Sequence, residues 1–224
     1  MANLNENYYF KKLLESIKGK VAVFIDAANL EKSVQDMRVH PKDVTDEFRH
    51  ISPDKLCWRV DYNALKNLFS KNFNLTQISF YTAHFGTDGH DGFLTKMKKG
   101  FGYRLVTKDI KNLPSDKNDD LVQCPKCKNE FKIFDKPHRK ADVDVEIAVD
   151  ATYNLANYDT IILFSGDSDF VYLLEFLGKK GKKKILFSRK GHVAKELFPE
   201  VDYFDIVDFR NIFLRVAQKA KNPA

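Results

Sequence analysis

The sequence has little of what marks secreted or membrane-spanning proteins. Its 224 residues include three cysteines, an odd number that argues against a disulfide framework and favours a reducing compartment. No apolar run approaches the roughly 20 residues that a helix needs to cross a bilayer. The N-terminal segment MANLNENYYFKKLLESIKGK lacks the apolar centre of a signal peptide. We therefore expect a cytoplasmic protein that makes no membrane contact.

The charge of the chain is only weakly one-sided. There are 37 basic and 31 acidic residues, which gives a net charge of +6. Basic residues crowd between Lys179 and Lys184 and again at Arg189 and Lys190. A basic rim of this kind suits a polyanion that is held by its backbone. The alternative is that these lysines are ordinary solvated ends of helices.

The apolar pattern alternates between strands and helices along most of the chain. Apolar runs predict strands over 21–26, 75–83, 102–108, 160–165, 183–188 and 203–206. Helical patterns lie between them and include 28–38, 61–69, 142–155, 168–177 and a C-terminal helix over 208–219. This alternation is typical of a three-layer α/β fold with a central, mainly parallel sheet. We expect a helical extension over 1–19, one domain over 20–217 and a tail over 218–224, with 109–139 forming a small inserted hairpin or excursion that contains a CxxC sequence.

Acidic and amide side chains follow two of the predicted strands directly. Asp26 and Asn29 end the run VAVFIDAANL, and Asp167 and Asp169 end IILFSGDSDF. Ligands of open α/β sheets bind at the carboxyl ends of the strands. Asp26 alone is equally explained as the cap of the next helix, but two acids in the second turn exceed what capping needs. Gly166 is expected to allow that turn through a positive φ.

Asp144 adds a third segment to this group. Ala148, Ala151 and Leu155 share its helical stripe, so the stripe is apolar and should face the sheet. Asp144 would then point inward from the first turn, toward the strand ends, while Asp142, Glu146 and Asp150 fall off the stripe and are interpreted as caps and solvated surface. Gathered carboxylates repel one another unless a cation lies among them. The pattern therefore predicts a Mg²⁺ or Mn²⁺ site used for phosphate chemistry.

These motifs together resemble a known family. FIDAANL, KADVDVEIAVDA and FSGDSDFVYLLEFLGKKGKK are similar to the NYN domain, in the LabA-like branch of the PIN-like nuclease superfamily, and WRVDYNALKNLF and GYRLVTKDIK extend the likeness to about residues 20–210. The resemblance implies a PIN-like, Rossmann-like fold and Mg²⁺- or Mn²⁺-dependent ribonuclease activity. It implies Asp26, Asp144, Asp167 and Asp169 as metal ligands, with Asn29 as polar support. Many members have glycine after the first acid, where this chain has Ala27.

The implied reaction is metal-assisted hydrolysis of RNA, single-stranded or structured. Asp26, Asp167 and Asp169 would hold one ion, and Asp144 would share a second. The competing hypothesis is a non-catalytic module that binds RNA or a protein partner in a regulatory role. A phosphatase of the haloacid-dehalogenase type is disfavoured, because it needs a second Asp where this chain has Ala28.

Further candidates lie outside the acidic set. We expect RNA contacts from two serines and four basic residues, namely Ser165, Ser168, Lys182, Lys183, Lys184 and Arg189. Tyr81 and Phe85 are the aromatics that would stack on bases if they are exposed.

The CxxC sequence, Cys124 to Cys127, has the spacing of two zinc ligands, whereas a structural zinc site normally needs four. Cys57, His138 and His50 are candidates for completing it, as is the same turn of a second subunit in a homodimer. A reduced, metal-free turn is the default.

Overall fold

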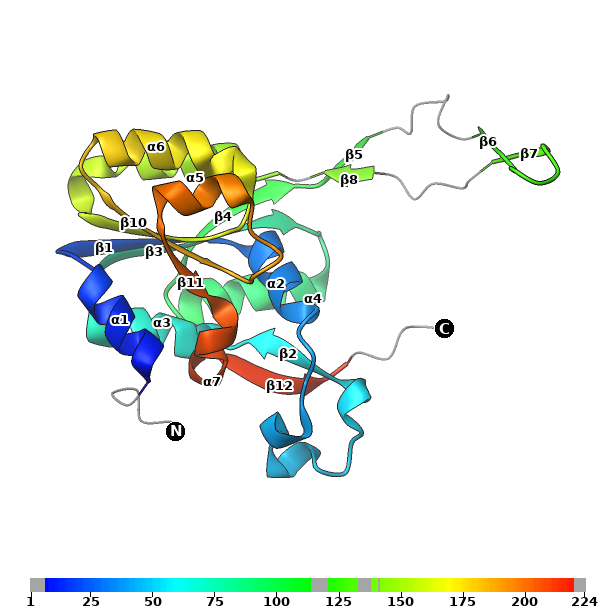
Figure 1. Cartoon of the computed structure of the whole chain (residues 1–224), viewed down its shortest axis with the longest axis horizontal. Coiled ribbons are helices and arrows are strands. Elements are labelled where there is room, and N and C mark those ends of the chain that lie inside the picture. The colour runs from blue at the N-terminus through cyan, green and yellow to red at the C-terminus, as the bar shows by residue number, and fades with distance from the viewer. Residues whose placement is uncertain (1–6, 114–120, 133–137, 141, 220–224) are drawn as a thin grey trace.

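The computed structural model describes residues 7–113, 121–132, 138–140 and 142–219, and within them six parallel strands form one central sheet (Figure 1). The strands lie in the order β11-β10-β9-β1-β3-β4. Their bounds are β1 Lys20–Asp26, β3 Asn74–His84, β4 Arg104–Asp109, β9 Thr160–Phe164, β10 Lys183–Ser188 and β11 Asp202–Asp205. Chain order along the sheet reverses between β1 and β9, as in doubly wound nucleotide-binding folds. The predicted α/β class is confirmed.

Strand β1 is apolar at every position from Val21 to Ile25 because both of its faces are covered. Val21, Val23 and Ile25 enter one hydrophobic core, and Ala22 and Phe24 enter the other. Successive side chains of a strand point to opposite faces, so a strand that is covered on both faces has no polar alternation. β1 is therefore the centre of the three layers.

Helices cover both faces of the sheet, as Figure 1 shows. The first core takes residues from α1, α2, α3 and α7, including Phe10, Leu30, Phe69 and Phe213, and the second takes Ile147 from α5 and Leu174 from α6. The bounds are α1 Tyr8–Ser16, α2 Ala27–Gln35, α3 Tyr62–Asn72, α4 Asp88–Thr95, α5 Asp144–Tyr153, α6 Val171–Lys179 and α7 Arg210–Phe213. No helix in the described ranges combines the length and the apolar character needed to span a membrane.

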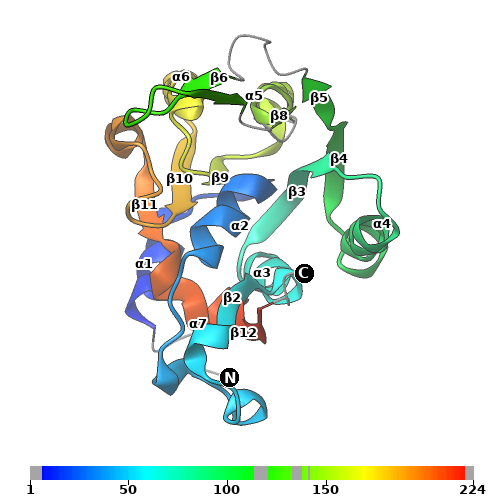
Figure 2. The ribbon, with the colours of Figure 1, turned by 90° about the vertical axis from the view of Figure 1, so that its right-hand side faces the viewer.

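The predicted C-terminal helix over 208–219 is wrong. The chain leaves α7 at Phe213 and continues as strand β12, Leu214–Gln218, which pairs antiparallel with β2, Leu56–Val60. Strand β2 is an element that the sequence analysis did not identify. Leu214 and Val216 are buried while Arg215 between them is exposed, a two-residue period too short to stand out beside the helical pattern before it. The β2–β12 ribbon packs beside α2, and β12 also contacts α7 (Figure 2).

The inserted segment forms antiparallel pairs. β5, Lys111–Leu113, pairs with β8, His138–Lys140, and the two extend from the body of the protein (Figure 1). β6, Leu121–Gln123, pairs with β7, Glu130–Lys132. The excursion expected over 109–139 therefore contains hairpin-like pairing where the structure describes it.

Candidate active site

The sequence-predicted acids meet where the sheet reverses its order. Asp26 is the last residue of β1, and Ser165, Gly166 and Asp167 follow the neighbouring strand β9. Because both strands are parallel, their carboxyl ends lie at the same edge of the sheet. This edge is the usual ligand position of such folds.

Asp26 is held firmly inside this edge. Its side chain is 6% exposed, Oδ1 accepts a hydrogen bond from the Asn29 backbone N–H at 3.1 Å, and Oδ2 accepts one from the Ser165 hydroxyl at 3.1 Å. Burial raises the pKa of Asp26, and these hydrogen bonds oppose that rise. The charge of Asp167 also raises the pKa. Asp26 therefore caps α2, as the alternative interpretation allowed, and also faces a second carboxylate.

Asn29 joins the two motifs. Its Oδ1 accepts a 2.9 Å hydrogen bond from the Gly166 backbone N–H, which fixes the start of α2 against the turn after β9. Gly166 does not have the expected positive φ. Glycine is required there for space, because a Cβ would lie 1.9 Å from the His192 carbonyl oxygen. The prediction of a glycine-dependent turn holds, but its cause is close approach of the backbone.

Asp144 occupies the first turn of α5, half-buried and directed toward the same edge. Its backbone N–H donates to Asp142 Oδ1 at 3.2 Å. Burial, a hydrogen bond with the Asp142 side chain and the charges of Asp142, Asp26 and Asp167 raise the pKa of Asp144 to about 8. Asp142 was interpreted as a cap, and it is also a member of the carboxylate group. Glu146, which was also interpreted as a cap or surface residue, forms an ion pair with Lys108 at 2.9 Å.

The turn after β9 presents its two acids differently. Asp167 is partly buried, and its Oδ1 accepts from the Asp169 backbone N–H at 3.1 Å. Asp169 is exposed at the start of the short 3₁₀ turn Ser168–Phe170 that precedes α6. Asp167, and not Ser168, caps this turn.

The carboxylates are neighbours without forming a closed ligand shell. Among the described residues, no three His, Cys, Asp or Glu side chains converge closely enough to hold an ion together. The donor chemistry nevertheless fits a hard divalent cation, because Asp26, Asp144 and Asp167 offer only carboxylate oxygens, and the charges of Asp26 and Asp167 raise the pKa of Asp144. A cation would remove that repulsion.

Three of the six expected RNA contacts follow the carboxyl ends of β9 and β10, namely Ser165, Ser168 and Arg189. Ser165 is buried, and its hydroxyl binds Asp26 and accepts from the Asp167 backbone N–H at 3.3 Å, so it supports the site from within. Ser168 is exposed. Arg189 follows the carboxyl end of β10 and contacts the His192 ring.

The lysine run lies at the wrong edge of the sheet for a basic rim. Lys183 and Lys184 begin β10, whereas the acids follow the other ends of the strands, ~20 Å away along a six-residue strand. Lys183 pairs with Asp202 at 2.6 Å, Lys184 pairs with Glu200 at 2.8 Å, and Lys182 donates to the Tyr158 carbonyl at 2.6 Å. The structure thus contradicts the placement of Lys182, Lys183 and Lys184 beside the acids.

Asp150 is a residue that sequence reasoning misjudged. Its side chain is 18% exposed and accepts a 2.7 Å hydrogen bond from the Tyr81 hydroxyl. Arg104 forms an ion pair with the same carboxylate. Tyr81, a proposed base-stacking residue, is fully buried beneath this pair, so of the two aromatics only Phe85 is exposed. Helical periodicity could not reveal the pair, because Arg104 belongs to β4.

The Cys124–Cys127 turn has features of a metal-binding knuckle. The backbone N–H groups of Cys127 and Lys126 donate to the Cys124 sulfur and lower the pKa of its thiol. Lys128 adopts a positive φ of 57°. Cys57 is buried on β2, where its thiol donates a hydrogen bond to the Ala217 carbonyl oxygen. It is therefore part of the core and does not complete a zinc site with the Cys124–Cys127 turn. The His138 side chain lies outside the described residues. Zinc at this turn therefore stays a prediction.

Comparison with known proteins places these features in context. The family model of the NYN domain matches residues 20–208. The Low amplitude and bright protein LabA of Synechococcus elongatus is 27% identical over 157 residues, which cover 69% of this chain and 76% of LabA. A crystal structure of a Vibrio parahaemolyticus protein of unknown function is similar with a TM-score of 0.54 and 19% identity, over 84% of this chain and 93% of that one. This last likeness supports the fold alone.

Proposed function

Because this chain belongs to the NYN domain family, whose members are PIN-like nucleases, we propose that it hydrolyses phosphodiester bonds of RNA with Mg²⁺ or Mn²⁺. The match over residues 20–208 agrees with the resemblance drawn from the motifs. RNA cleavage and its dependence on a metal go beyond the family match, and the geometry at the β1–β9 edge supports them.

One observation carries the proposal. Asp26, Asp144 and Asp167 come from three separate segments, and the charges of Asp26 and Asp167 are close enough to Asp144 to raise its pKa. Caps and surface acids do not need to gather in this way, and gathering them unneutralised is unfavourable. A site that binds a cation and a phosphate gives the arrangement a purpose.

Each residue has a distinct part in the proposed site. Asp26, Asp144 and Asp167 would hold the ion, and Asp169, on the exposed side of the turn, would join them when substrate and ion are bound. Asn29 is a positioning residue, since its oxygen binds the Gly166 N–H and fixes the turn that bears Asp167. Ser165 holds the Asp26 carboxylate by its hydroxyl. When bound, the divalent ion supplies Lewis acidity that activates water and offsets the charge developing on the phosphate.

The test is cleavage of end-labelled single-stranded RNA by the purified protein in Mn²⁺, in Mg²⁺ and in EDTA. Asp26→Asn is the informative variant, because asparagine caps helices as well as aspartate does and the fold should persist. We expect cleavage only with metal, and a loss of at least about 100-fold in the variant, the order of a lost transition-state charge contact.

Asp205→Asn is the matched control. Asp205 also ends a parallel strand and also caps the following turn, by accepting the Val207 N–H at 2.9 Å, but it belongs to the edge strand β11. Cleavage should survive this change. A folded wild-type protein that cleaves no RNA in either metal, yet binds RNA, would replace the nuclease with the second candidate, a non-catalytic RNA-binding module.

A further inference from the structure

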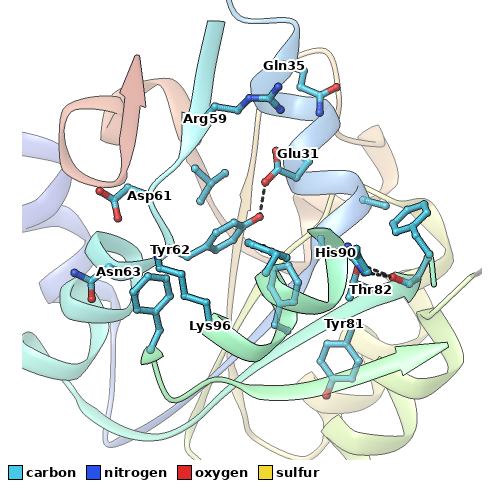
Figure 3. Close-up of a pocket in the computed structure, with 18 of the residues that line it drawn as sticks. Glu31, Gln35, Arg59, Asp61, Tyr62, Asn63, Tyr81, Thr82, His90 and Lys96 are labelled. Carbon is cyan, nitrogen blue, oxygen red and sulfur yellow. Dashed lines mark hydrogen bonds between the residues drawn. The ribbon is translucent and has the colours of Figure 1, made fainter. Parts of the chain in front are cut away.

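A large cavity adjoins the acidic site. It has a volume of about 1000 Å³ and lies among α2, β2, β3 and α4 (Figure 3). At one end its wall contains Ala27 and Ala28, which directly follow Asp26, and Val143, which directly precedes Asp144. A molecule in the cavity would therefore lie beside the segments that bear the Asp26 and Asp144 carboxylates, although these side chains are not part of the wall. The volume is at the upper end for small-ligand pockets and so has room for more than one nucleotide unit.

Two arginines line this cavity from the β2–β12 ribbon. Arg59 on β2 and Arg215 on β12 are directly opposite each other in the antiparallel register. Within the part of the chain that the structure describes, neither guanidinium forms an ion pair or a hydrogen bond. Like charges directly opposite each other weaken a strand pair. An anion bound by both would turn this repulsion into attraction, and the guanidinium fork matches phosphate oxygens.

The two acidic residues in the same wall, Glu31 and Asp61, form no ion pair with either arginine among the described residues. Glu31 accepts a 2.6 Å hydrogen bond from the Tyr62 hydroxyl, as Figure 3 shows. Asp61 caps α3 by accepting the Ala64 N–H at 2.9 Å. Both carboxylates thus have roles in holding the wall. The arginine pair, together with exposed Lys96, leaves the cavity with more basic than acidic side chains.

The α4 side of the cavity is aromatic. Phe85 is 52% exposed, although it is a large apolar residue, and its ring meets the His90 ring edge-on at 4.8 Å between centroids. Phe93 and Phe101 are half-buried in the same wall, and the Lys96 ammonium lies 5.4 Å from the centre of the Phe101 ring. Exposed rings beside cations are the surfaces on which unpaired bases stack.

We propose that this cavity binds the single-stranded part of an RNA next to the phosphate that is cleaved, with a base stacked on Phe85 and a backbone phosphate between Arg59 and Arg215. The inference rests on the proposed function, since it gives the same site its substrate. It names unpaired RNA as the substrate class, because a base can stack on a protein ring only when it is free of its own helix.

Binding is measured with a short fluorescein-labelled single-stranded RNA in the Asp26→Asn background, where the strand stays intact. The double variant Arg59→Gln/Arg215→Gln should weaken binding about tenfold or more and flatten the dependence of log Kd on log salt concentration, by a slope of about 0.7 for the lost phosphate contact. Arg49→Gln is the matched control, because Arg49 is exposed and pairs with Asp46 away from the cavity. The melting temperature checks that the ribbon still forms.

The aromatic part is tested separately with a 2-aminopurine base in the same strand. Stacking should quench its fluorescence on binding, and Phe85→Ala should abolish the quenching. Tyr153→Ala, which removes an 86% exposed ring from α5, should leave it unchanged. AMP serves as a competitor. If AMP displaced the RNA when present at the same concentration as the RNA, the cavity would be a site for a free nucleotide, and the proposal would be overturned.

The outcomes distinguish this inference from the proposed function. If wild-type protein cleaves RNA with metal, but the arginine and Phe85 variants bind as tightly as their background, the cavity is not the RNA subsite and the nuclease stands. If wild-type protein neither cleaves nor binds RNA, both are overturned.

Discussion

Asn29 Oδ1 accepts a 2.9 Å hydrogen bond from the backbone N–H of Gly166, and this contact ties the helix after β1 to the turn after β9. The two strands are neighbours in the sheet, and the Ser165 hydroxyl supplies a second link, since it donates to Asp26 Oδ2 and accepts from the Asp167 backbone N–H. The position of Asp167 relative to Asp26 therefore depends on two side chains, Asn29 and Ser165.

Asn29→Ala should loosen that turn. We expect the free energy of unfolding to fall by about 1–2 kcal/mol, because the Gly166 N–H loses its acceptor, and RNA cleavage to fall with it. Urea denaturation and the cleavage assay measure the two effects. Asn29→Asp retains an acceptor oxygen and should keep most of the stability. An alanine variant with the wild-type urea midpoint would show that the contact has no structural weight.

Gly166→Ala should be costly for a different reason. A Cβ at this position would lie 1.9 Å from the His192 carbonyl oxygen and 2.7 Å from Ser188 Oγ, so backbone must move. We expect a loss of about 1–3 kcal/mol in thermal or urea unfolding. Gly89→Ala is the control, since Gly89 lies in α4 with nothing within 4 Å of its Cβ position and should gain roughly 0.5–1 kcal/mol. Equal effects of the two changes would contradict this account.

Asp150 should stabilise the folded protein at neutral pH and lose this effect in acid. Burial raises its pKa, but the hydrogen bonds from Arg104 and Tyr81 and the Arg104 charge outweigh burial, so the net pKa lies below the ordinary 3.8. The folded state then binds fewer protons than the unfolded state between the two values. The contribution is therefore complete above pH 3.8 and is lost as pH falls through the folded-state pKa.

Asp150→Asn tests this pH dependence. The wild-type protein should be more stable than the variant by about 1 kcal/mol at neutral pH, which is the scale of a partly exposed ion pair. The difference should shrink in urea unfolding curves recorded below pH 3.8. A difference that stays constant with pH would mean that the Asp150 charge does not matter to stability.

Replacing Lys182, Lys183 and Lys184 with glutamine should leave RNA affinity and its salt dependence unchanged. These lysines are at the amino ends of the strands and are engaged by Asp202, Glu200 and the Tyr158 carbonyl. We expect a small loss of stability, about 1 kcal/mol or less per ion pair. Fluorescence anisotropy with single-stranded RNA measures the affinity. If this triple variant bound RNA more weakly, and its affinity depended less on salt concentration, the lysines would be RNA contacts after all.

The acidic motifs could be predicted from sequence because each stands beside a strong local signal. Asp26 and Asp167 end continuous apolar runs, which identify buried strands, and parallel strands bring their carboxyl ends together. Asp144 was placed by the apolar stripe of its own helix. In each case the pattern lies within about a dozen residues, so no long-range information was needed.

The rest depends on pairings between distant segments. β12 was predicted as helix because its partner β2 lies far away in the chain, and the opposition of Arg59 and Arg215 exists only in that pairing. The lysine run looked like a basic rim because a sequence shows charge without showing partners such as Asp202 and Glu200. The cause of the Gly166 requirement, the His192 carbonyl, was hidden for the same reason.

Calorimetric titration of Mn²⁺ into the wild-type protein, Asp26→Asn and Asp205→Asn tests the central claim most directly, since it asks whether the carboxylates at the β1–β9 edge form a cation site. The account predicts saturable binding to the wild type and to Asp205→Asn, and binding at least about tenfold weaker in Asp26→Asn, because a buried anionic ligand is lost. No binding to the folded wild type, or equal binding to all three proteins, would contradict it.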